Sequence, residues 1–283
     1  MTMLDRRFTP ARPDLAAETL KGVVEARNFV AGEMKQVASF TAPLRSAPAG
    51  DQGYETEALY GERVCVFEDS EGWAWGQLEG DRYVGYLPSA MLRDPEPAAT
   101  HRLKVLRSFF YPGPSMKLPI SGTLPMGGEV FVQRIEGDFA VTADGYIWAD
   151  HLTSVDQSAS DFVTVAEQFL GAPYLWGGKS SLGLDCSGLV QVSLAMAGIS
   201  APRDSDLQAS FGDALPLAQE PSGLKRGDLV CWKGHVGIMR DAETLLHATG
   251  HSMLVASEPL RVVAERILKT VERPILAIRR INV

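Results

Sequence analysis

Residues 63–92, RVCVFEDSEGWAWGQLEGDRYVGYLPSAML, alternate apolar and polar positions between two short turns. The turns have the sequences DSEG (69–72) and EGD (79–81). This alternation predicts half-buried β-strands, and turns of this length join strands antiparallel. Residues 129–152, EVFVQRIEGDFAVTADGYIWADHL, repeat this pattern of apolar runs and glycine turns after the linker-like segment DPEPAAT (94–100). We therefore predict two small all-β barrels in tandem.

The length, charge and cysteine content of the chain limit the kinds of protein it can be. With 283 residues it exceeds what one core usually holds, which predicts two or three domains. A net charge of −8, without a basic run, argues against nucleic-acid binding. No segment has the apolar length of a signal peptide or a membrane span, so we expect a cytoplasmic protein. Three cysteines, Cys65, Cys186 and Cys231, fit a reducing compartment better than a disulfide scaffold.

The rest of the chain mixes helical and strand patterns. Residues 14–31 predict a short helix after Pro13, and residues 161–172 predict another that Asp161 caps. DCSGLVQVSLAMAGI predicts a third helix, and short apolar runs then predict strands up to PILAIRRI (274–281). Helices followed by an antiparallel sheet predict an α+β domain. The expected divisions are a helical segment (1–29), a first barrel (30–95), a second barrel (100–155) and the α+β domain (160–283).

Cys186 opens the third predicted helix directly after Asp185, a capping residue type. Unpaired N–H groups and the positive end of the dipole favour an anion there, and a thiolate is such an anion. The neighbouring Asp185 carboxylate acts in the opposite direction, and the sequence does not decide which effect is larger. For a single cysteine, a small buried residue at the start of a helix is the preferred interpretation.

Two histidines favour a reactive role for Cys186 over a purely structural one. His235 follows a Gly turn at the start of a predicted strand, and His247 lies twelve residues later on the next one. A hairpin of that length brings the two imidazoles near each other. One can accept the thiol proton and the other can hold its ring in the required tautomer.

The motifs PYLWGG, LDCSGLVQ, APRDSDLQ, LKRGDLVCWKGHVGIM and LLHATG follow in this order over residues 160–283. Together they resemble the NlpC-type family of peptidoglycan cysteine endopeptidases, which have a papain-like fold. The resemblance implies Cys186 as nucleophile, His235 as general base and His247 as the orienting third member. It also implies Tyr174 as a second oxyanion donor beside the Cys186 amide, and neither a metal nor a cofactor.

The tandem barrels resemble bacterial SH3 domains. With them, the chain is similar to the γ-D-glutamyl-L-diamino acid endopeptidases of murein-peptide recycling, which cut short peptides with a free N-terminal L-Ala. That resemblance implies a murein peptide as partner and leaves the diamino acid and the oligomeric state open. It also implies a set of substrate-binding residues: Trp176, Asp185, Ser187, Asp204 and Ser205, with Glu57 and either Tyr83 or Tyr86 contributed by the first barrel.

A zinc site is an alternative from another class. The pairs Cys231 with His235 and His247 with His251 have a two-by-two ligand spacing. Residues four apart on a strand share a face but stand about 13 Å apart, too far to share one ion. Two further alternatives stay open, namely a wall-binding protein without catalysis and an amidase or endopeptidase acting on intact wall.

Overall fold

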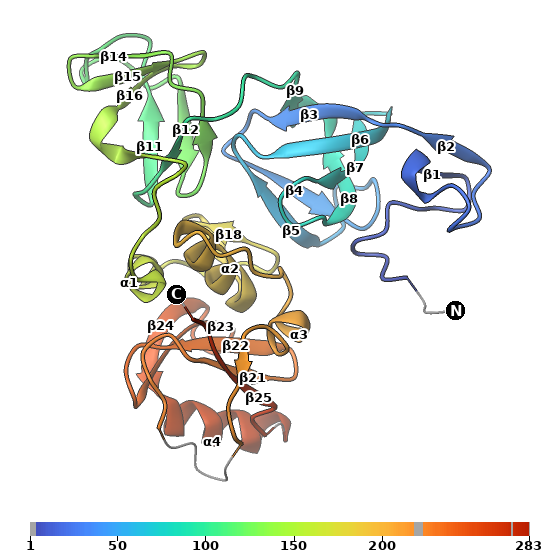
Figure 1. Cartoon of the computed structure of the whole chain (residues 1–283). Helices are drawn as coiled ribbons and strands as arrows, with labels where there is room; N and C mark the ends of the chain where they lie inside the picture. The colour runs from blue at the N-terminus through green and yellow to red at the C-terminus, as the bar shows by residue number, and fades with distance from the viewer. Residues whose placement is uncertain (1–3, 218–222, 273, 283) are drawn as a thin grey trace. The chain divides into compact units, whose positions relative to one another are not determined.

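The structure is a computed structural model that describes residues 4–217, 223–272 and 274–282. The chain divides into two units, Met1–Val155 and Asp156–Val283, which are described separately (Figure 1). Among the described residues, no helix combines the length and the apolar character needed to cross a membrane.

A seven-stranded antiparallel sheet dominates the first unit. Its order is β5-β4-β8-β7-β6-β3-β9, and β6, β7 and β8 are the strands predicted from the alternating pattern. Val64 and Val66 point into the core while Arg63 and Cys65 are less buried, as the alternation requires. The strands are β3 (Glu33–Val37), β4 (Thr41–Arg45), β5 (Tyr54–Leu59), β6 (Arg63–Ser70), β7 (Trp73–Leu78), β8 (Val84–Pro88) and β9 (Leu92–Arg93).

Residues 101–154 form three smaller antiparallel sheets with a hydrophobic core of their own. Leu103, Phe110, Leu124 and Ile147 are buried in that core, and Tyr60 joins it from the first part of the unit. The unit therefore contains two separate cores. The strands are β10 (His101–Leu103), β11 (Arg107–Phe110), β12 (Gly122–Pro125), β13 (Glu129–Val130), β14 (Arg134–Glu136), β15 (Phe139–Thr142), β16 (Gly145–Trp148) and β17 (Leu152–Ser154). Short 3-10 turns, η2 (Ser89–Met91) and η3 (Ala149–His151), precede β9 and β17.

The helix expected over residues 14–31 is absent from this described segment. The segment forms the strands β1 (Leu15–Ala17) and β2 (Asn28–Val30), paired in parallel, with one 3-10 turn, η1 (Glu18–Leu20), between them. The burial of three consecutive residues in β1 fits a strand covered on both faces better than a helix with a single apolar stripe. Gly22 adopts a positive φ of 84°, which also ends helical geometry. The prediction was wrong because tertiary burial outweighed a weak helical spacing.

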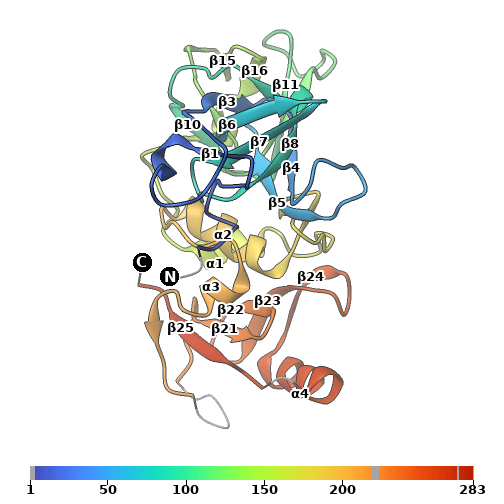
Figure 2. The same ribbon diagram turned by 90° about the vertical axis from the view of Figure 1, so that its right-hand side faces the viewer.

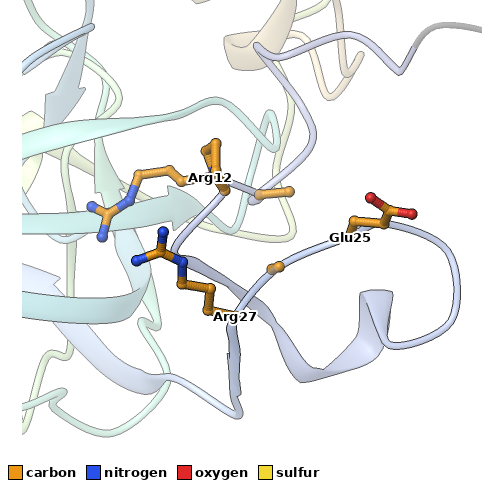
Figure 3. Close-up of a pocket in the computed structure, with 6 residues that line it drawn as sticks. Arg12, Glu25 and Arg27 are labelled. Atoms are coloured by element: carbon orange, nitrogen blue, oxygen red, sulfur yellow. The ribbon is translucent and has the colours of Figure 1, made fainter.

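A hollow of about 610 Å³ lies between residues 11–13 and 25–27 of this segment. In Figure 3, the Arg12 and Arg27 side chains extend away from Glu25. The Arg12 guanidinium donates to Glu68 at 2.7 Å and to the Tyr86 hydroxyl at 2.9 Å, and it lies over the Trp75 ring. Arg12 therefore fastens the N-terminal segment to the sheet.

The second unit places helices around a six-stranded antiparallel sheet of order β20-β25-β21-β22-β23-β24, which is the mixed fold expected from the sequence. Both views place α2 and α4 on opposite sides of this sheet (Figures 1 and 2). The elements are α1 (Phe162–Glu167), β18 (Lys179–Ser180), β19 (Gly183–Leu184), α2 (Cys186–Met196), α3 (Ser205–Gln208), β20 (Asp213–Ala214), β21 (Leu229–Trp232), β22 (His235–Met239), β23 (Thr244–Thr249), β24 (Leu254–Pro259), α4 (Leu260–Val271) and β25 (Ala277–Arg280).

Of the helices in this unit, α1 was predicted from local sequence signals and α4 was not. The predicted cap of α1 is confirmed, because the Asp161 side chain accepts from the Val163 amide at 2.9 Å. Helix α4 was not predicted, although Leu260, Val263 and Ile267 have helical spacing and pack against the sheet.

Candidate active site

Cys186 occupies the first position of α2, as the sequence predicts. The Asp185 carboxylate caps the helix by accepting from the Gly188 amide at 2.7 Å. A side chain at Gly188 would meet the Gly178 carbonyl at 2.2 Å, so only glycine lets the preceding loop approach the helix this closely. The cap and the close loop together bury the cysteine, which is 7% exposed.

Burial decides the protonation of this thiol. Burial and, to a smaller extent, the Asp185 carboxylate together raise the pKa of Cys186 to about 12. Hydrogen bonds from the backbone of Val236 and Ser187 lower the pKa by less. The resting thiol is therefore protonated at neutral pH. The Val236 contact also places the sulfur beside the first peptide of β22, directly after His235.

The two histidines lie on neighbouring strands of the sheet, as predicted. His235 Nε2 is 2.8 Å from His247 Nδ1, and the two rings meet edge to face. The Trp232 ring packs against the other side of the His235 ring, with centroids 5.6 Å apart. Burial, the neighbouring His247 and Arg266 lower the pKa of His235 to about 3, so its imidazole is neutral and able to accept a proton.

Glu258 and Arg266 extend this arrangement, and sequence reasoning missed both. His247 Nε2 is 3.0 Å from Glu258 Oε1, and Arg266 donates to both oxygens of Glu258 at 2.7 and 2.8 Å. Arg266, followed by His247, holds the pKa of Glu258 down at about 2. His247 pairs across the ladder with Ala256, so Glu258, two residues further along β24, lies on the same face. That register is a tertiary fact, and no sequence motif marks either residue.

A buried ion pair supports the start of α2, and its arginine was also missed. Arg203 is 1% exposed and donates to Asp185 Oδ1 at 2.9 Å and to Oδ2 at 2.7 Å. It also donates to the Ser187 hydroxyl at 2.9 Å. Asp185 accepts further bonds from the Ser187 hydroxyl and the Gly177 amide. Both carboxylate oxygens of Asp185 are thus engaged within the protein.

The RDSD segment lies against the start of α2. Asp204 is the N-cap of α3 and Ser205 its first residue, and both are half-buried. Gln208, one helical turn later, donates to the Ser187 carbonyl at 3.0 Å. The structure thus brings Asp204 and Ser205 to the element that carries Cys186.

Tyr174 and Trp176 lie on the loop before β18. Burial raises the pKa of Tyr174, and the charges of Cys186 and Asp185 raise it further, so the phenol lies within electrostatic reach of the sulfur. The Trp176 side chain is 69% exposed. It is the one residue of the predicted set in this unit that presents a large apolar surface to solvent.

The three predicted substrate-binding residues of the first unit differ in burial. Tyr83 is a core residue and Glu57 is buried, accepting from the Thr41 hydroxyl at 3.1 Å. Tyr86 is half-buried, and its hydroxyl accepts from Arg12.

The zinc alternative does not fit the strand geometry. Cys231 pairs with Val236, so it lies on the opposite face of the sheet from His235. Its side chain is buried, and burial raises the pKa of its thiol to about 12. Within residues 4–217, 223–272 and 274–282, no cluster of three His, Cys, Asp or Glu side chains could hold a metal ion.

The buried neutral imidazole predicts loss of stability in acid. Since the pKa of His235 falls from 6.5 to about 3 on folding, the unfolded chain binds more protons between these values. The free energy of unfolding should therefore be highest above pH 6.5 and decline as pH falls toward 3. Glu258 adds to the decline below pH 4.5. Hydrogen exchange of the α2 amides at a series of pH values measures this slope. His235→Asn should flatten it, and an unchanged slope in that variant would contradict the assignment.

Comparisons with known proteins identify relatives of both units. A sequence model of the NlpC/P60 family matches residues 171–271, and one named bacterial dipeptidyl-peptidase SH3 domain matches residues 44–92. The chain is 28% identical over 232 residues to gamma-D-glutamyl-L-lysine dipeptidyl-peptidase of Bacillus subtilis, covering 72% of this chain and 75% of the relative.

Two further relatives agree with these matches. Dipeptidyl-peptidase 6 of Lysinibacillus sphaericus is 30% identical over 200 residues, covering 69% of this chain and 70% of the relative. The crystal structure of an NlpC/P60 family protein from Bacillus cereus superimposes with a TM-score of 0.71 at 20% identity, covering 88% of this chain and 99% of the other. That structural likeness shows the fold.

Proposed function

Since this chain belongs to the NlpC/P60 family of cysteine peptidases, we propose that it hydrolyses the bond between γ-D-glutamate and the diamino acid of short murein peptides with a free N-terminal L-Ala. The observation that carries the proposal is that the Cys186 sulfur meets the backbone of Val236, the residue directly after His235, and that the His235 ring is hydrogen-bonded to His247. The name of the Bacillus subtilis relative supports the γ-D-glutamyl specificity.

The geometry supports a nucleophilic mechanism with Cys186, His235 and His247 as its catalytic group. His235 accepts the thiol proton as sulfur attacks the γ-amide carbonyl, because the neutral imidazole is the base available beside a protonated thiol. The imidazolium then protonates the leaving amine of the diamino acid. Water, deprotonated by His235, hydrolyses the thioester and restores the thiol.

The oxyanion of each tetrahedral intermediate forms at the N-terminal end of α2. The Cys186 amide belongs to the first turn of α2, where backbone N–H groups lack partners within the helix. Tyr174 is the proposed second donor, because its phenol stays protonated and lies within electrostatic reach of the sulfur.

We assign the recognition of the substrate ammonium to Asp204 and Ser205, with Trp176 as an apolar wall. All three lie on loops or a helix start beside the cysteine helix, and Trp176 is exposed. Asp185 and Ser187 act in this proposal through Arg203, because their hydrogen bonds hold that arginine in place. From the first unit, Glu57 and Tyr86 stay predicted substrate contacts, and Tyr86 is preferred to Tyr83 because Tyr83 is part of the core.

The organisation of the remaining chain belongs to the same proposal. The first β-structure, matched over residues 44–92, is an SH3-like domain, and we assign residues 100–155 to a second one. Residues 100–155 have a hydrophobic core of their own and antiparallel hairpins, and both features support the assignment of a second SH3-like domain. The catalytic domain then spans 160–283. A role in recycling short wall peptides places the protein in the cytoplasm.

The test uses defined peptides and mass analysis of the products. L-Ala-γ-D-Glu-L-Lys and its meso-diaminopimelate counterpart should each be tried, and L-Ala-γ-D-Glu should be released from the preferred one. N-acetylation of the same peptide is the matched control. It should lower kcat/KM by about 100-fold or more, because the groups that bind the ammonium lose their partner. Equal cleavage of both forms would contradict the requirement for a free amine and favour an endopeptidase of intact wall.

A further inference from the structure

Glu258 lies between the catalytic histidines and a helix on the other side of the sheet from the cysteine helix. Its Oε1 meets His247 Nε2 at 3.0 Å, while both oxygens receive the Arg266 guanidinium at 2.7 and 2.8 Å. The His247 side chain is 1% exposed, and Glu258 is its hydrogen-bond partner on the Nε2 side. Arg266 comes from α4 and Glu258 from β24.

The positions of the hydrogen atoms follow from these contacts. An ionised carboxylate only accepts, and Glu258 is ionised at neutral pH. His247 must therefore carry its hydrogen on Nε2, which leaves Nδ1 of its neutral ring as an acceptor. His235 Nε2, 2.8 Å from that Nδ1, must then be the donor. The neutral His235 ring is left with an unprotonated Nδ1.

We propose that Glu258 and Arg266 form a positioning pair that fixes the tautomers of His247 and His235, so that His235 presents its Nδ1 lone pair as the base for Cys186. The proposal rests on the proposed peptidase activity for its kinetic consequence. The tautomers themselves do not depend on the identity of the substrate.

Removing the carboxylate opens the opposite arrangement. A neutral His247 can then carry its hydrogen on Nδ1 and donate to His235 Nε2. The His235 hydrogen moves to Nδ1, and the base for Cys186 is lost. Arg266 matters because its two parallel bonds hold the carboxylate plane in one orientation. The charged or titratable groups that act on His247 are His235 of β22, Glu258 of β24, Arg266 of α4 and His251 of the following turn.

A purely structural role for this ion pair makes a different prediction. An ion pair that only fastens α4 to β24 affects stability and leaves the tautomers and kcat unchanged. The same helix supplies a matched control, because Arg261 and Glu265 form a pair at 3.0 Å whose side chains are 81% and 49% exposed.

The experiment compares Glu258→Gln and Arg266→Met with Glu265→Gln and Arg261→Met in the full chain. For Glu258→Gln we expect kcat to fall about 10- to 100-fold with KM nearly unchanged, and a smaller fall for Arg266→Met. Both control variants should keep the wild-type kcat. Nitrogen NMR of labelled histidine, without substrate, should show His247 protonated at Nε2 in the wild type and a mixed population in Glu258→Gln.

The NMR readout keeps the two proposals separable. A wild-type protein that cleaves no murein peptide would contradict the proposed function and leave the tautomer measurement valid. His247 protonated at Nδ1 in the wild type would overturn the positioning pair. So would an unchanged tautomer and kcat in Glu258→Gln. If Glu258→Gln does not fold, Arg266→Met with the same NMR measurement decides the question.

Discussion

Replacement of Cys186 by alanine is expected to lower peptide hydrolysis at least about 1,000-fold, to the background of the assay. In the proposed mechanism the sulfur is the atom that forms the covalent intermediate, and no other side chain of the proposed catalytic group can replace it. Cys186→Ala should nevertheless fold, because alanine fits the first turn of a helix that Asp185 still caps. The measurement is product release from the preferred tripeptide, followed by mass analysis.

Cys231→Ala is the matched control for this prediction. Cys231 is another buried cysteine of the same unit, and its thiol pKa is raised to a similar value. It lies on the opposite face of the sheet from His235, so its removal should leave kcat within a factor of two or so. A wild type and a Cys186→Ala variant that are equally inert would favour the non-catalytic, wall-binding alternative.

Replacement of Arg203 by methionine is expected to destabilise the second unit by about 3–5 kcal/mol. The change leaves the Asp185 carboxylate without its cation in a site where Arg203 is 1% exposed and the pair is joined by two bonds. Asp185 also caps α2, so the first turn of that helix should loosen together with the pair. Hydrogen exchange of the α2 amides, measured with a urea titration, reports both effects.

Arg261→Met provides the control for the buried pair. Its ion pair with Glu265 is largely exposed, and pairs of this kind contribute little to stability. We expect a change below about 1 kcal/mol for that variant. Equal effects of the two substitutions would show that the buried pair with Asp185 has no special importance for α2.

The resting state of the active site differs from the simplest expectation for a cysteine at a helix start. A helix end and two backbone donors favour the thiolate, but such an effect is modest, typically about 0.3–1 kcal/mol at exposed sites. Burial and the adjacent Asp185 charge are larger here and keep the Cys186 thiol protonated. Burial also keeps His235 neutral, so in the proposed mechanism the proton moves from sulfur to imidazole during attack on the substrate.

Several features were predictable because they depend on neighbours in the chain. The Asp185 cap, the start of α2 at Cys186 and the Asp161 cap follow from residue types within one helical turn. The hairpin that joins His235 to His247 follows from a short separation between two apolar runs. The weak helical spacing of residues 14–31 misled, because the segment forms a parallel strand pair in which all three residues of β1 are buried.

The sequence by itself therefore determined which side chains are proposed to carry the chemistry, because capping, strand alternation and hairpin length act over a few residues. Only the tertiary structure decided their electrostatics and hydrogen bonding. Arg203 reaches Asp185 across 18 positions of sequence, and Glu258 reaches His247 only through the register of β23 with β24. The protonation of Cys186 likewise depends on how deeply α2 is buried, which is a property of the packed domain. Residue types and their short spacings can be read from the sequence, whereas burial, strand register and the pairing of distant charges exist only once the chain has folded.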